Sequence, residues 1–175
     1  MKISIFKNIK TVTPLSKSVD ALKVLEEIRD GKYKSQVASI RVETDKEKRN
    51  ELKSKLHYVT FGGVFTSRSN SNLKYHSGLA CLDFDDINID ELKDKVNNDK
   101  YTFSSFVSPS GNGLKVLVKI PLVDNNEDYQ DYYVEIQKHY DSYAKTDDAP
   151  KAIATACYLS YDSSLFINTE SETFT

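Results

Sequence analysis

The sequence has little of what builds zinc centres or disulfide frameworks: it contains two cysteines and three histidines in 175 residues, and no tryptophan. Cys81 and Cys157 are far apart, and each lies in an apolar segment, so we expect two buried free thiols. No histidine is closely spaced with another histidine or with a cysteine, which argues against a structural zinc site.

Long apolar runs are also missing. No segment approaches the roughly 20 apolar residues of a membrane span, and the N-terminal residues MKISIFKNIK have no apolar signal core. The sequence therefore predicts no membrane partner and a cytoplasmic location.

The chain carries no large excess of charge of either sign. Its net charge is −2, so binding to nucleic acid would need a local basic patch rather than a global field. The hydrophobic fraction of 39% and the charged fraction of 29% are typical of a globular protein. The length predicts one domain over residues 1–175, with a frayed polar tail at 169–175.

Residue periodicity predicts strands and helices in alternation. The expected strands lie at 3–7, 58–65, 77–87, 101–107, 114–120 and 165–167. The expected helices lie at 19–30 with Ser18 as N-cap, at 45–56 with Thr44 opening a capping box, and at 89–97, 127–144 and 152–159. Strands 101–107 and 114–120 are too close for a crossover helix and predict a hairpin, so we expect an α+β fold with a largely antiparallel sheet and helices packed on it.

The stretch SGLACLDFDDI, residues 77–87, ends in closely spaced carboxylates. Alternate residues of a strand share a face, so Asp83 and Asp85 lie roughly 6.6 Å apart on one side. Two like charges beside a buried strand need a cation or a proton between them. A simpler interpretation is an acidic turn, in which Asp86 or Asn88 caps the next helix.

The stretch SPSGNGLK, residues 108–115, is the second candidate binding segment. It is not a phosphate-binding P-loop, because Leu114 separates the glycine from the lysine, and not a dinucleotide fingerprint, because Val116 stands where the third glycine belongs. A serine- and glycine-rich turn can still bind an anion through backbone N–H groups. The candidate nucleotide-binding residues are Ser108, Ser110, Gly111, Gly113 and Lys115.

Basic residues are concentrated in the predicted helix after Thr44 and in the loop 66–72. Lys46, Arg49, Lys53 and Arg68 are candidate contacts for a nucleic-acid backbone. The alternative is a solvated helix face and a solvated loop arginine.

LACLDFDD resembles the first motif of the archaeo-eukaryotic primase (PrimPol) superfamily, and SPSGNGLKVLV resembles its second motif. The closer similarity is to the VirE N-terminal domain, a primase-like module of bacterial mobile elements and phages. FGGVF, the loop arginine and CYLSYD also fit its pattern, and the similarity covers about residues 45–168.

This resemblance implies a primase-polymerase-like core with an RRM-like sheet, acting as a metal-dependent nucleotidyltransferase in DNA replication of a mobile element or phage. Asp83, Asp85 and Asp147, with Asp148 as the near alternative to Asp147, would hold Mg²⁺ or Mn²⁺ for attack of a 3′ hydroxyl on a nucleoside triphosphate. The implied partners are a nucleoside triphosphate, a DNA template, and a helicase or replication protein.

Two departures from this pattern keep other functions open. Many superfamily members have histidine where Lys115 stands, and the arginine expected in the helix after Asp147 falls at Thr155. The alternative is a non-catalytic nucleic-acid or nucleotide-binding module that assists a replication helicase. A third interpretation is another metal-dependent enzyme, although Gly113, two residues before Lys115, argues against common nucleases.

Overall fold

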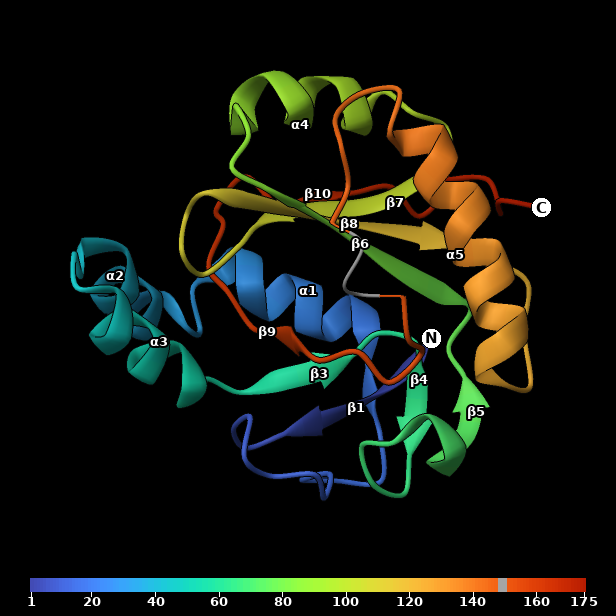
Figure 1. Cartoon of the computed structure of the whole chain (residues 1–175), viewed down its shortest axis with the longest axis horizontal. Coiled ribbons are helices and arrows are strands. Elements are labelled where there is room, and N and C mark those ends of the chain that lie inside the picture. Colours follow the sequence, from blue (N-terminus) through green and yellow to red (C-terminus); the bar gives the residue numbers. More distant parts are fainter. Residues whose placement is uncertain (148–150) are drawn as a thin grey trace.

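The computed structural model describes residues 1–147 and 151–175 (Figure 1). Its α-helices are α1 Ala21–Asp30, α2 Lys34–Val42, α3 Lys46–Ser54, α4 Ile89–Asn97 and α5 Asn126–Tyr140. The strands are β1 Lys2–Phe6, β2 Val19–Asp20, β3 Tyr58–Thr60, β4 Gly63–Phe65, β5 Leu73–His76, β6 Leu79–Asp85, β7 Thr102–Val107, β8 Gly113–Lys119, β9 Cys157–Tyr158 and β10 Phe166–Ile167. A short 3₁₀ helix, η1 Asn70–Asn72, precedes β5. The pairings between these strands are antiparallel, so the predicted α+β fold is confirmed.

Two four-stranded sheets and a hairpin build the fold. The sheets have the orders β2-β1-β3-β9 and β10-β7-β8-β6, and β4 pairs with β5. Helix α1 lies between the two larger sheets, where its apolar face joins one buried cluster (Figure 1). Helices α4 and α5 cover the other face of the β10-β7-β8-β6 sheet and enclose a second cluster. That sheet is therefore covered on both faces.

Strand β6 alternates as a half-buried strand should. Leu82 and Phe84 are fully buried against α4 and α5, whereas Asp83 and Asp85 project from the opposite face, toward the other sheet. The register with β8 places Lys115 directly opposite Asp83. The two carboxylates therefore lie in the space between the sheets rather than in the α4–α5 core.

The strand predicted at residues 58–65 is broken at its glycines, since β3 ends before Gly62 and β4 begins at Gly63. A Cβ atom on Gly62 would lie 2.2 Å from the carbonyl oxygen of Ile153. The backbones approach so closely that only glycine fits there.

Two predicted helix starts are wrong. Asp20, not Ser18, caps α1, because its side chain accepts a hydrogen bond from the Leu22 N–H and residues Val19–Asp20 pair with β1. Asp45, not Thr44, caps α3 by accepting from the Lys48 N–H. Helix α2 was not predicted, because it buries only Val37 and Ile40 and so shows little periodicity.

The helix predicted at residues 152–159 is absent. Residues 152–154 form a bend and a turn, and Cys157–Tyr158 form β9, which pairs with β3. The free edge of β3 offers backbone hydrogen bonds, such as the one from the Leu159 N–H to the His57 carbonyl (2.9 Å). Tertiary pairing has thus overridden the helix preference of alanine.

Residues 169–175, expected to be a frayed tail, dock on the sheet instead. The Phe174 N–H donates to the Lys119 carbonyl at 2.8 Å, and Thr173 forms a parallel bridge with Lys119. The Phe174 ring lies 4.9 Å from the Tyr101 ring centroid and 5.7 Å from that of His139. Aromatic packing supplies the burial that a polar composition does not predict.

A search of the described residues for membrane spans finds no helix both long and apolar enough to cross a bilayer.

Candidate metal and nucleotide site

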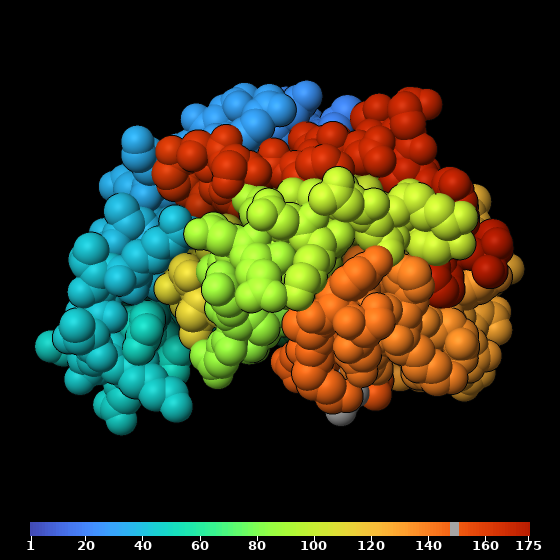
Figure 2. All heavy atoms as spheres, turned by 90° about the horizontal axis from the view of Figure 1, so that it is seen from above, coloured from blue at the N-terminus to red at the C-terminus, as the bar shows by residue number. Residues whose placement is uncertain are grey.

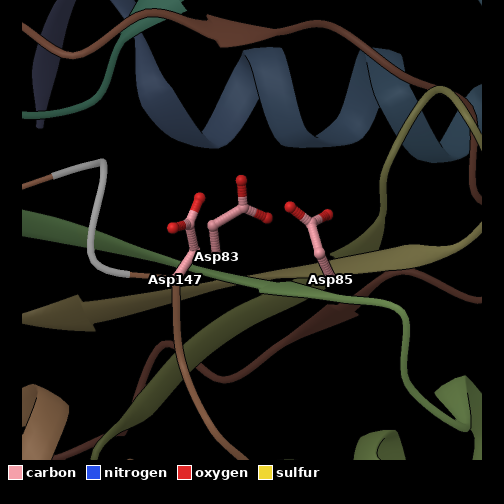
Figure 3. A group of neighbouring side chains, drawn as sticks. All are labelled: Asp83, Asp85 and Asp147. Carbon is pink, nitrogen blue, oxygen red and sulfur yellow. The ribbon is translucent and has the colours of Figure 1, made fainter.

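Three aspartates meet at one edge of the β10-β7-β8-β6 sheet (Figure 3). Each of Asp83, Asp85 and Asp147 offers a carboxylate oxygen, and these oxygens lie within 4.8 Å of one another. Asp147 follows α5, and its backbone N–H donates to the Asp83 carbonyl at 2.8 Å, which fixes it beside β6. The structure thus brings all three together, while the alternative Asp148 lies outside the described residues.

Lys115 forms an ion pair with the Oδ2 atom of Asp83. Both side chains are largely buried, with exposed fractions of 17% and 16%. Burial opposes the ammonium charge, but Cys157 and Asp83 outweigh it, so the pKa of Lys115 is raised. The Oδ1 atom of Asp83 is buried and has no hydrogen-bond partner among the described residues.

The donor set fits a hard divalent cation such as Mg²⁺ or Mn²⁺, which prefers carboxylate oxygens. Oxygens on one Mg²⁺ lie roughly 3 to 4 Å apart, so small side-chain movements would let all three aspartates bind one ion. A cation would also satisfy the buried Oδ1 atom of Asp83. Burial and then the Asp83 charge raise the pKa of Asp85, as expected where carboxylates lie close together.

The turn between β7 and β8 holds its shape through internal hydrogen bonds. The Ser108 N–H donates to the Gly113 carbonyl (2.8 Å), the Gly111 N–H donates to the Ser108 carbonyl (3.0 Å), and the Gly113 N–H donates to the Ser108 hydroxyl (3.2 Å). These three amides therefore serve the turn itself.

Glycine is required at two positions of this turn for different structural reasons. Gly111 has a φ of 83°, a left-handed conformation that favours glycine. A Cβ atom on Gly113 would lie 2.8 Å from the Asp85 Oδ1 atom and 2.8 Å from the Phe84 carbonyl. The missing side chain of Gly113 thus makes room for Asp85.

Arg41 on α2 is a site residue that the sequence did not indicate. Its Nη2 atom donates to the carbonyls of Ser108 (3.1 Å) and Tyr161 (2.9 Å), and its side chain packs against Gly111. Arg41 holds the serine-glycine turn in place beside the aspartates. No local motif marks it, because its partners are 67 and 120 residues away.

A polar cavity of about 280 Å³ opens beside the aspartates. Figure 2 shows the α2–α3 pair (cyan to teal) standing apart from the α4 region (green), with the yellow β7–β8 turn between them. The cavity is lined by Lys53, Asp83, Asp85, Asp86, Ser108, Pro109, Ser110, Asn112, Lys115, Ala156 and Tyr158.

Of the four predicted basic residues, one lines the cavity. Lys53 lines the cavity, whereas Lys46 and Arg49 lie elsewhere on α3. Arg68 also stays outside the cavity, where its guanidinium lies over the Tyr58 ring at 5.2 Å. The structure therefore places Lys53 in the same cavity as the aspartates, and the other three outside its lining.

Cys81 and Cys157 are free thiols, as predicted; Cys157 is buried and Cys81 is partly exposed. Both line a small neighbouring cavity of about 40 Å³, together with Thr155. The Asp83–Lys115 pair lines both cavities and so lies at their boundary.

Residues 51–166 match the family model described as BT4734-like, N-terminal domain. The match covers more than half of the chain, so the chain belongs to this family. No curated protein and no solved structure matched the chain.

The family match corrects the assignment drawn from the motifs. The matching family is distinct from the VirE N-terminal domain of the archaeo-eukaryotic primase superfamily, so that assignment was wrong. Nothing in the match points to primase or PrimPol activity. Lys115 can therefore no longer be compared with a histidine of the primase superfamily. The same holds for the comparison of Thr155 with an arginine.

Proposed function

We propose that this member of the BT4734-like N-terminal domain family is a metal-dependent nucleotidyltransferase that acts on nucleic acid. One observation carries the proposal: carboxylates from β6 and from the segment after α5 converge beside a polar cavity that also contains two lysines. Anionic ligands for a cation and cationic groups for an anion together suit a metal-bound phosphate. We also propose a cytoplasmic location, where nucleoside triphosphates are available.

Each part of the cavity has a role in this proposal. Asp83, Asp85 and Asp147 would hold Mg²⁺ or Mn²⁺. When bound, the ion would neutralise charge on the phosphates and polarise the phosphorus–oxygen bond that breaks. Lys115 and Lys53 would bind non-bridging phosphate oxygens, with the turn at Ser108 and Ser110 closing one side of the cavity.

A DNA template is proposed along α3. Lys46 and Arg49 lie on the same helix as Lys53, outside the cavity, so a strand whose end enters the cavity would pass these side chains. Phosphate contacts of this kind weaken as salt rises.

A primer-extension assay tests the proposal. Wild-type protein is incubated with a primer–template duplex, labelled nucleoside triphosphates and Mn²⁺, and we expect a lengthened primer. The Asp83→Asn plus Asp85→Asn variant should lose this activity, and Lys48→Ala, which removes an exposed charge of the same helix, should keep it. Equal extension by the double variant would contradict the mechanism.

A non-catalytic nucleotide-binding module is the second candidate function. The Asp83–Lys115 ion pair favours it, because the lysine already neutralises a carboxylate that a metal ion would need. This candidate predicts nucleotide binding that persists in EDTA, whereas the enzyme predicts binding that depends on the metal.

A further inference from the structure

Tyr158 and Lys53 form one wall of the cavity, and the proposed function gives the tyrosine no role. Tyr158 lies on β9, an edge strand, and its ring is partly exposed. Lys53 reaches the same place from α3, with its Nζ atom 5.8 Å from the centroid of the Tyr158 ring. The Lys53 ammonium group thus lies over the Tyr158 ring at the wall of a polar cavity.

Lys53 has the properties of an anion-binding group. It is partly buried, and none of the ion pairs among the described residues includes it. Lys53 and Lys115 line the same cavity, so their two ammonium groups share one polar space. Because Lys53 lies in none of these ion pairs and borders a polar cavity, its ammonium group is available to a phosphate oxygen.

Tyr158 is the aromatic residue among the described residues that line this cavity. The Asn112 amide, the other neutral planar group of the lining, donates to the Asp86 carboxylate at 3.2 Å. The cavity therefore offers one aromatic surface on which a base could stack.

Building on the proposed function, we propose that Tyr158 and Lys53 form its nucleotide subsite, in which the tyrosine ring stacks on the base and Lys53 binds a phosphate oxygen. The substrate class is then a nucleotide rather than an inorganic polyphosphate or a sugar phosphate. Stacking tolerates every base, because every base has a π-face, so the subsite accepts purines and pyrimidines alike.

Calorimetric binding of three ligands tests the subsite: ATP, CTP and inorganic tripolyphosphate, each with Mn²⁺. In Tyr158→Leu, which keeps bulk but not the ring, ATP and CTP should bind about 5- to 150-fold more weakly, the equivalent of one lost stacking contact. Tripolyphosphate should bind as it does to wild type. Tyr158→Phe, which keeps the ring, should bind all three ligands normally.

Substitution of Lys53 should change the three affinities in a different way. Lys53→Ala should weaken all three ligands, and the matched control Lys48→Ala should weaken none. The subsite would be overturned if Tyr158→Leu weakened the binding of tripolyphosphate and ATP equally, or weakened neither. Either result would leave the proposal of metal-dependent binding intact. Wild-type protein that binds none of the three ligands would instead overturn the proposed function, and the subsite with it.

Discussion

Lys115 lies directly opposite Asp83 in the β6–β8 ladder, and its ammonium group binds the Asp83 carboxylate. Side chains opposite one another in an antiparallel pair are within reach, so the register itself creates this ion pair. The same carboxylate belongs to the three that could hold a metal ion. The lysine occupies Oδ2 and leaves Oδ1 for a metal ion, so the two positive charges would share one carboxylate and repel each other.

Removing the lysine should strengthen binding of the metal alone. We expect Lys115→Gln to bind Mn²⁺ about tenfold more tightly, which corresponds to about 1.4 kcal/mol, because a repelling positive charge is gone. Titration with electron paramagnetic resonance measures free Mn²⁺ directly, and Lys48→Gln controls for the change in net charge. Weaker binding by Lys115→Gln would show that the lysine supports the metal site.

Metal binding should depend on pH through Asp85. Its pKa is raised above the ordinary value of 3.8 by burial and by Asp83. Because Asp85 must be ionised to bind a cation, Mn²⁺ affinity should begin to fall at a pH above that of an ordinary aspartate as the solution is acidified. Calorimetry between pH 4 and 8 measures this, and Asp85→Asn should show a flatter profile.

The same raised pKa has a consequence for stability. A carboxyl group with a raised folded-state pKa costs stability when it ionises, above that pKa. Asp85→Asn should therefore melt at a higher temperature than wild type at pH 7 without metal, and the difference should vanish at a pH low enough to protonate Asp85. A lower melting temperature at pH 7 would contradict the assigned electrostatics.

Gly113→Ala should damage the site and the fold together. The new Cβ atom would meet Asp85 Oδ1 and the Phe84 carbonyl, each at 2.8 Å, and the second of these is backbone that cannot move away freely. We expect a loss of about 1–3 kcal/mol in the free energy of unfolding and a weaker affinity for Mn²⁺. Urea denaturation gives the first and calorimetry the second; an unchanged metal affinity would show that Asp85 can move without cost.

The buried ion pair between Lys93 and Asp162 should be needed for stability. Asp162 accepts from the Lys93 ammonium (2.7 Å) and from the Val107 N–H (2.9 Å). Asp162→Ala leaves a buried ammonium unpaired and should cost about 3–5 kcal/mol, measured by urea denaturation. The exposed pair of Glu91 with Lys95 is the control, since Glu91→Ala should cost far less.

The contribution of Asp162 to the free energy of unfolding should depend on pH. Although burial opposes it, bonds from Lys93 and Val107 lower the pKa of this carboxyl below 3.8. Its stabilisation is thus present above 3.8 and is lost as pH falls through the folded-state pKa. In acid, wild type and Asp162→Ala should therefore converge in stability, and a constant difference would contradict this.

Much of the framework follows from local patterns. The strand predicted at 114–120 is β8; its Leu114, Val116 and Val118 pack against α4 and α5, and Leu117 is buried on the opposite face. The acidic spacing at Asp83 and Asp85 predicted a shared face, and the structure shows it. Apolar periods of two and 3.6 residues are present in the sequence itself, so strands and helices can be predicted from them without the structure.

Other elements could not be predicted because distant partners decide them. The segment at 152–159 has helical composition, but the open edge of β3 draws Cys157–Tyr158 into a strand. Helix α2 has too few apolar residues to show a period, yet it supplies Arg41.

The sequence by itself determined the α+β class, the β7–β8 hairpin and the carboxylate pair on β6, because each depends on neighbours within a few residues. Only the tertiary structure decided that Asp147 joins the pair, that Lys115 is bound to Asp83, and that Lys53 and Tyr158 face the same cavity. Those relationships depend on strand register and on packing between the two sheets, which bring residues of high sequence separation into contact.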